Sequence, residues 1–394
     1  MADYIGLRIA RWRDANGMTQ QQLADRIGVT DAYISMIERG RRPVTKRSTL
    51  IALASALGVG VTDLTGQPTA PRSGDELAIY SAVPQLRGAL DDDFDGAPVG
   101  LDVLSGALDE AMRARMACDY PVLARTLPGL VKGARQLADS GDAAGPALLV
   151  RAALTTALVI KPFGWVDLAA RYAERAELTA RLLGPVEQAA AAFGAAQVAL
   201  ASGTPGGRRR SLRTVVRAAE QLGDDGDDAL LTWYGMLHLH AALSAAALGT
   251  GDPDLHLAEA EGAARRTGSD PWRMEFTEAN VGIWRVGVAV ENGAPDKAPQ
   301  YARLVDRSKI QTANRRTRLH IDAGRGWYAV GDTDQAIRCF LEADKANPAE
   351  LRSRPSVREL VGQMVRDARR NGSEPLRDLA VRMGLDPLDV DHAT

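Results

Sequence analysis

Residues 19–40, TQQQLADRIGVTDAYISMIERG, predict two short helices joined by a tight turn. Thr19 is a good N-cap, and Gln22 follows at the spacing of a capping box, in which two residues satisfy each other's free backbone N–H groups. Apolar residues then recur at helical spacing over residues 20–27. Gly28 follows where this helix must end in a residue of positive φ, which glycine adopts at little cost. The turn after the first helix is therefore fixed by local sequence.

The second helix of this stretch has an inward and an outward face. Thr30 caps it, and Ile34 and Ile37 turn inward at helical spacing, while Ala24 is small where the two helices meet. These features fit helix-turn-helix geometry, in which the second helix enters the DNA major groove, although a plain helical hairpin with a polar face is the alternative. We expect these residues at DNA: Gln20, Thr30, Asp31, Ala32, Tyr33, Ser35, Met36, Arg39, Arg41, Arg42 and Lys46.

Residues 4–64 resemble the lambda-repressor/Cro-like helix-turn-helix family, also called the xenobiotic-response-element family. The resemblance rests on IGLRIARWRDANGMTQQQLADRIGV, ISMIERGRR and LIALASALGV. It implies a five-helix domain that binds double-stranded operator DNA, with Gln20 at a phosphate and Asp31, Ala32 and Met36 at the bases. Ala32 and Met36 stand where the family often has glutamine, and they cannot form a bidentate hydrogen bond with a base. The operator sequence is therefore not readable from this helix.

Composition and charge favour an all-α protein of two or more domains that binds DNA as a homodimer. The chain has 394 residues with 5% aromatic residues, is rich in alanine, leucine and arginine, and has few alternating β-branched runs. Its formal net charge is −2. Residues 1–65 hold nine Lys/Arg and six Asp/Glu, so the rest of the chain carries −5. A DNA-binding segment of only +3 suggests that two copies share the phosphate contacts.

We expect a cytoplasmic protein that is not an enzyme and has no cofactor and no metal site. Cys118 and Cys339 lack partners at metal spacing and are expected to be buried thiols. The acidic stretch 91–100 lacks the glycine and closing glutamate of a calcium loop. His238 and His240 are two residues apart, so on a helix they point away from each other. No HExxH, GxxxxGK[ST] or GxSxG motif occurs, and we expect no membrane-spanning stretch.

Four segments follow from the change in composition along the chain. Residues 1–66 form the helix-turn-helix domain, and residues 67–75 form a linker rich in proline, glycine and small polar residues. Residues 76–370 form a sensor and dimerisation domain, and residues 371–394 a C-terminal helix and tail.

The long third segment contains repeats like the tetratricopeptide unit of about 34 residues. The clearest unit is 317–350, in which small residues and Phe340 fall at the helix contacts and Pro348 ends the second helix. Fainter copies have turns at Gly164, 249–254 and Gly293, and the offset from Gly293 to Gly331 is 38 residues. We expect a tetratricopeptide-like array of about five hairpins, closed by a capping helix over residues 357–370 and a short helix over residues 374–385.

The whole layout resembles actinobacterial regulators with a repressor-like N-terminal domain and a tetratricopeptide sensor. This resemblance implies a transcriptional regulator that senses a peptide or small molecule on the concave face of the repeats. The first helix of each repeat lines that face. In the register of the best repeat, the expected ligand-binding residues are Asn280, Ile283, Trp284, Arg318, Asp322 and Arg325. Solvated or intra-repeat pairs are the alternative for each. The alternative function is a protein-interaction scaffold in which DNA binding is secondary.

Overall fold

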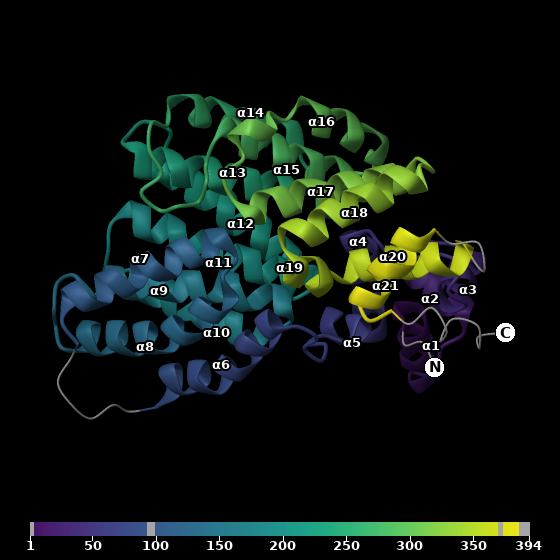
Figure 1. Cartoon of the computed structure of the whole chain (residues 1–394), viewed down its shortest axis with the longest axis horizontal. Helices are drawn as coiled ribbons and strands as arrows, with labels where there is room; N and C mark the ends of the chain where they lie inside the picture. The colour runs from purple at the N-terminus through teal and green to yellow at the C-terminus, as the bar shows by residue number, and fades with distance from the viewer. Residues whose placement is uncertain (1–3, 93–98, 369–372, 386–394) are drawn as a thin grey trace.

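The protein is all-α, as the sequence predicts, and Figure 1 shows how its helices are arranged. A computed structural model describes residues 4–92, 99–368 and 373–385. Most of the acidic stretch 91–100, the end of the expected capping helix and most of the tail lie outside the described residues.

Five short helices form the N-terminal unit, residues 4–66, which we call the head. Thr19 Oγ1 accepts a hydrogen bond from the Gln22 backbone N–H at 3.1 Å, and the Gln22 side chain accepts one from the Thr19 N–H at 2.8 Å. The predicted capping box is confirmed, and so is the left-handed Gly28, at φ 71°. The helices are α1 Ile5–Ala15, α2 Gln20–Ile27, α3 Asp31–Glu38, α4 Arg47–Leu57 and α5 Val61–Thr65.

The rest of the chain is dominated by six consecutive hairpins, α7 to α18, which we call the array. The sequence predicted about five. The predicted turns at Gly164, Gly249, Gly293 and Gly331 all separate the two helices of a hairpin, and each has a positive φ. The hairpin helices are α7 Leu101–Ala117, α8 Tyr120–Asp139, α9 Gly145–Ile160, α10 Val166–Ala180, α11 Pro185–Ala201, α12 Pro205–Leu222, α13 Asp228–Leu248, α14 Pro253–Arg266, α15 Glu278–Glu291, α16 Ala298–Leu304, α17 Ala313–Ala329 and α18 Thr333–Ala346.

Further helices flank the array. Helix α6 precedes it, and α19 to α21 follow it, with α20 in the place of the expected capping helix and α21 in that of the expected short C-terminal helix. Short 3-10 turns η1 and η2 lie between the two helices of a hairpin, and η3 joins α16 to α17. The bounds are α6 Gly74–Asp91, α19 Pro348–Ser353, α20 Pro355–Ala368, α21 Glu374–Arg382, η1 Lys161–Phe163, η2 Pro295–Lys297 and η3 Arg307–Lys309.

The array closes on itself, whereas the sequence predicted an open concave face. The first helices of successive hairpins, α7, α9, α11, α13, α15 and α17, contact each other in order. Helix α17 also contacts α7, so the last hairpin meets the first. The inner helices therefore surround a space instead of lining an open groove.

The head is docked on the array and on the C-terminal helices. Helix α4 contacts α12 and α13. The Ile5 backbone N–H donates to Glu359 Oε1 at 2.8 Å, and Arg366 Nε donates to the Gly40 carbonyl at 3.1 Å. Gln67, in the expected linker, donates to the Ser353 carbonyl at 2.9 Å. The segment between head and array is therefore held by polar contacts.

Two apolar features of the fold stand out. Trp12 follows Ile5 and Ile9 on α1 but is 40% exposed, whereas those two residues are buried. The segment 145–163 is long and apolar enough to span a membrane, with mean hydropathy 1.4, although no such stretch was expected. Because 67% of this segment is buried inside the protein, where α9 packs between α8 and α10, it has the character of a core helix.

Candidate DNA-binding face and central cavity

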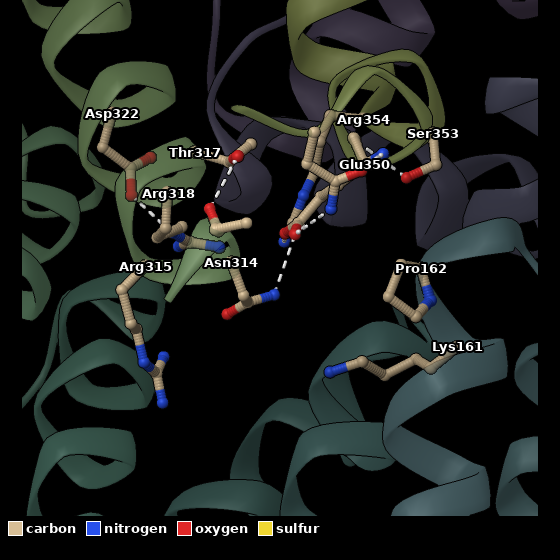
Figure 2. A network of polar contacts seen from close by, with 12 residues as sticks. Lys161, Pro162, Asn314, Arg315, Thr317, Arg318, Asp322, Glu350, Ser353 and Arg354 are labelled. Atoms are coloured by element: carbon tan, nitrogen blue, oxygen red, sulfur yellow. Dashed lines mark hydrogen bonds and ion pairs between the residues drawn. The ribbon is translucent and has the colours of Figure 1, made fainter. Parts of the chain in front are cut away.

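The inner helices and the docked head line a partly open cavity of about 290 Å³. The array contributes side chains from all six inner helices, the head contributes residues 44–51 at the start of α4, and residues 350–356 add a further wall. Figure 2 shows Lys161 on one side of this space, with Asn314, Arg315 and Arg318 on the other. Segments far apart in the chain thus meet around one site.

The lining of the cavity is strongly basic. Eight basic side chains face three carboxylates, an excess of five positive charges in a protein whose net charge is −2. The basic residues are Lys46, Arg47, Arg115, Lys161, Arg315, Arg318, Arg325 and Arg354, and the carboxylates are Glu291, Asp322 and Glu350.

The three carboxylates are all engaged by arginines. Arg325 donates to Glu291 Oε1 at 2.8 Å and to Asp322 Oδ1 at 3.0 Å, and its third contact is the Thr45 carbonyl of the head at 3.0 Å. Arg318 Nε bonds Asp322 Oδ2 at 2.5 Å. Burial by itself would raise the pKa of Asp322, but Arg318 and Arg325 outweigh it and lower that pKa. The same holds for the pKa of Glu291 beside Arg325.

Glu350 forms the corresponding pair on the third wall of the cavity. It pairs with Arg354 and accepts a hydrogen bond from Asn314 Nδ2 at 2.8 Å. The direct ion pairs of these carboxylates are therefore with Arg318, Arg325 and Arg354.

Four other cavity cations have no carboxylate in direct contact. Across the described ranges 4–92, 99–368 and 373–385, no carboxylate oxygen lies within 4.0 Å of Arg47, Arg115, Lys161 or Arg315. Burial, followed by the charges of Arg354 and Arg47, lowers the pKa of Lys161 to about 7. Burial also lowers the pKa of Arg47 and that of Arg115 to about 10 each. Burial in the cavity therefore disfavours the charged forms of these side chains.

Lys161 is held by a polar chain that leads to a buried histidine. Its Nζ donates to Gln197 Oε1 at 2.5 Å, and Gln197 Nε2 lies 3.3 Å from His240 Nδ1. His240 Nε2 lies 2.9 Å from Ser211 Oγ, and burial lowers the pKa of His240 to about 3. His238 Nδ1, by contrast, lies 3.0 Å from His256 Nδ1. His238 and His240 therefore have separate partners.

Helix α3 presents a polar face away from the core of the head. Asp31, Ala32 and Arg39 are exposed, and Tyr33, Ser35 and Met36 are partly exposed. Ile34 and Ile37 are buried at 0% and 1% exposure. The Thr30 side chain caps the helix by accepting from the Tyr33 N–H at 3.2 Å. The structure therefore brings the expected base-contacting residues together on one accessible face.

The expected DNA-binding residues outside α3 have three different surroundings. Arg41 and Arg42 are exposed just after α3, and the Arg42 guanidinium lies 4.9 Å from the centre of the Tyr33 ring. Gln20 is half-buried, and its Nε2 donates to Glu38 Oε2 at 2.7 Å. Because the side-chain amide is engaged in this way, a phosphate contact at Gln20 would use the backbone N–H groups at the start of α2. Lys46 lies at the mouth of the cavity, at the N-cap of α4.

Comparisons with known proteins agree with the geometry of the head. A family model described as helix-turn-helix matches residues 9–64. The HTH-type transcriptional regulator y4dJ of Sinorhizobium fredii is 42% identical over 64 residues, covering 16% of this chain and 82% of that protein.

This chain belongs to the helix-turn-helix transcriptional regulators. The immunity repressor protein of Bacillus phage phi105 is 31% identical over 119 residues, covering 27% of this regulator and 81% of the repressor. Among solved structures, Bacillus thuringiensis PlcR in complex with the peptide PapR7 and DNA is similar over 100% of this chain and 96% of its own, at 10% identity and a TM-score of 0.34. That this regulator is of the actinobacterial type stays a prediction.

The expected ligand residues of the regulator divide into two groups. Trp284, Arg318, Asp322 and Arg325 line the cavity. Ile283, which is 1% exposed, packs into a core cluster, and Asn280, also 1% exposed, is absent from the lining. These two residues therefore lie away from the cavity.

The position of these two residues away from the cavity follows from the repeat offset. The 38-residue spacing between turns does not keep the helix faces in register, because α15 has 14 residues and α17 has 17. The cavity residues Trp284 and Glu291 lie 34 residues before Arg318 and Arg325. A fixed 34-residue offset would have found Glu291, whereas Arg47, Arg115 and Lys161 have no signal in the repeat pattern.

Proposed function

We propose that this protein is a sequence-specific DNA-binding transcriptional regulator whose array senses a peptide or small-molecule signal and mediates homodimerisation. It acts in the cytoplasm, without catalysis and without a cofactor. The working division is residues 1–66 for DNA binding, 67–75 for the connection, 76–370 for sensing and dimerisation and 371–394 for the C-terminal helix and tail.

The outward face of α3 carries this proposal. In helix-turn-helix proteins the N-terminal part of the second helix meets base edges, and residues around it contact phosphates. Asp31, Ala32 and Met36 occupy that position and are accessible to differing degrees. Arg41 and Arg42 extend beyond α3, where they supply positive charge for the backbone of the duplex.

The docked head gives the signal a direct path to DNA affinity. Arg325 of the array donates to the Thr45 carbonyl, and Glu291 accepts from the Arg47 backbone N–H at 3.1 Å. A ligand that favours one position of the head over another changes how two heads reach half-sites about 34 Å apart. A differential of about 1–3 kcal/mol alters operator affinity about 5–150-fold.

Genome-wide footprinting of the tagged full chain in its host, followed by binding to the recovered sites in vitro, tests the proposal. We expect a shared palindromic sequence whose two halves are about one helical turn, or a multiple of it, apart. Binding without any sequence preference would contradict the proposal and favour the protein-interaction scaffold.

A further inference from the structure

We infer that the central cavity binds a small organic phosphate, in which a phosphate or diphosphate group is joined to an apolar or aromatic body, and that the head supplies Arg47 to the site. The inference deepens the proposed function, because it names the class of signal that the sensing cavity takes.

The first step is the imbalance of donors and charge. Arg47, Arg115, Lys161 and Arg315 come from α4, α7, η1 and α17, and four cations so placed repel one another across one cavity. Two of them donate to neutral backbone carbonyls: Arg115 Nη2 donates to Arg273 O at 2.7 Å and Arg315 Nη2 donates to Met274 O at 2.8 Å. The remaining N–H groups call for a ligand that brings acceptors and negative charge.

The second step is the size of the space. A cavity of about 290 Å³ holds a small molecule, so the compensating charge has to be dense. A phosphate ester brings about two negative charges and three acceptor oxygens in one group. A peptide brings one terminal carboxylate. Its backbone N–H donors would find few free acceptors in this donor-rich lining. The chemistry of the walls therefore favours a phosphate.

The third step is the apolar part of the lining. Phe193, Met236, Trp284 and Ile321 also face the cavity, from α11, α13, α15 and α17. An inorganic anion would make no apolar contact with these side chains, whereas an apolar or aromatic body would pack against them. The site thus matches a molecule with one highly charged end.

The fourth step is the contribution of the head. Arg47 begins α4, and its backbone N–H is fixed by Glu291 while its guanidinium belongs to the cavity lining. A phosphate bound by Arg47 and by Arg315 of the array would contact the DNA-binding unit directly. Ligand binding and head position are then coupled through one shared anion.

The test uses the purified full chain, with binding measured by calorimetry and thermal shift. The probes are pyrophosphate, ADP, isopentenyl diphosphate, citrate and adenosine. We expect pyrophosphate to bind, at least one of the two organic diphosphates to bind more tightly, and citrate to bind about tenfold or more weakly than pyrophosphate. Whether ADP or isopentenyl diphosphate is preferred identifies the body as aromatic or aliphatic. Adenosine alone should not bind.

Variants separate cavity binding from binding elsewhere. Arg315→Met and Arg47→Met should each weaken diphosphate binding about tenfold or more, since each removes charge-assisted hydrogen bonds. Arg316→Met removes the same charge from an exposed neighbour on the same helix and should leave binding unchanged. Circular dichroism confirms that each variant is folded.

Three results would overturn the inference. They are the absence of diphosphate binding, equal binding of citrate and pyrophosphate, and an equal loss of binding in Arg315→Met and Arg316→Met. Operator binding is measured on the same preparations. Sequence-specific DNA binding without diphosphate binding would reject the inference alone and leave the proposed function standing, whereas diphosphate binding without DNA binding would reject the proposed function.

Discussion

The head and the array distribute polar side chains in opposite ways. On α3 the polar groups other than Glu38 point outward and the isoleucines point inward, so a single helix carries the whole pattern. In the array, basic groups from separate helices point inward to one cavity, although the chain beyond residue 65 carries a net −5. A site on one helix is readable from local periodicity, whereas a site made by closure of the chain is not.

Arg325→Met should have the largest effect, because this side chain joins the two regions. Its loss leaves Glu291 and Asp322 buried with less compensation and removes the contact to Thr45. Breaking a buried pair in this way costs about 3–5 kcal/mol of unfolding free energy. Urea unfolding followed by circular dichroism measures it. Arg316→Met is the control on the same helix and should change stability by less than about 0.5 kcal/mol. A similar small effect of both variants would show that the network does not stabilise the junction.

Much of the head could be predicted from the amino-acid sequence, because its signals are local. The capping box at Thr19, the left-handed Gly28 and the buried Ile34 and Ile37 all depend on residues a few positions apart. That the outward residues of α3 contact DNA is also inferred from local sequence, and it stays a prediction.

The array was only partly predictable. Hairpins with glycine turns at Gly164, Gly249, Gly293 and Gly331 were found, but the turn at Gly203 between α11 and α12 was missed. The turn between α7 and α8 is made by Cys118 at φ 60°, which no sequence rule signals. Contact between α7 and α17, about 200 residues apart in the chain, creates the cavity. The position of Arg115 or Lys161 on this cavity depends on that closure, so periodicity within a repeat could not reveal it.

Gly6→Ala should destabilise the head and leave the array intact, which sharpens the separation of the two regions. A Cβ at Gly6 would lie 1.9 Å from the Ile37 carbonyl oxygen, so α1 and α3 must move apart at a cost of about 1–3 kcal/mol. Hydrogen exchange should show faster exchange in α1 and α3 alone. Gly106→Ala is the matched control in an exposed part of α7, where a Cβ meets no atom within 4 Å and helix propensity improves. Equal effects of the two variants would contradict the close packing of α1 on α3.

Lys161→Met should stabilise the ligand-free protein by about 1–2 kcal/mol at pH 7, because the ammonium is buried and keeps only part of its hydrogen bonding. The folded pKa of Lys161, about 7, is below its ordinary value of 10.5. Between these pH values the unfolded chain binds more protons, so wild-type stability rises with pH. The advantage of the variant should therefore shrink from pH 7 to pH 10 in urea titrations. An advantage that grows with pH would contradict the depressed pKa.

Arg42→Ala should have the smallest effect, confined to the head. Loss of one phosphate contact weakens binding to all DNA sequences about equally and lowers the slope of log K against log salt by about 1. Fluorescence anisotropy at several salt concentrations measures this slope. Arg316→Ala in the array is the control and should leave the slope unchanged. A change of sequence preference in Arg42→Ala would show that this arginine reads bases.

The most direct test of the account is the ratio of affinities for a recovered operator and a scrambled duplex, measured by anisotropy at about 150 mM salt. The account predicts a ratio of about 10³ or more for the wild-type chain. It also predicts a sharp fall in this ratio for Asp31→Ala and Met36→Ala, with binding to the scrambled duplex nearly unchanged. A wild-type ratio near one, or a ratio that neither substitution on α3 alters, would contradict the claim that this helix reads DNA sequence.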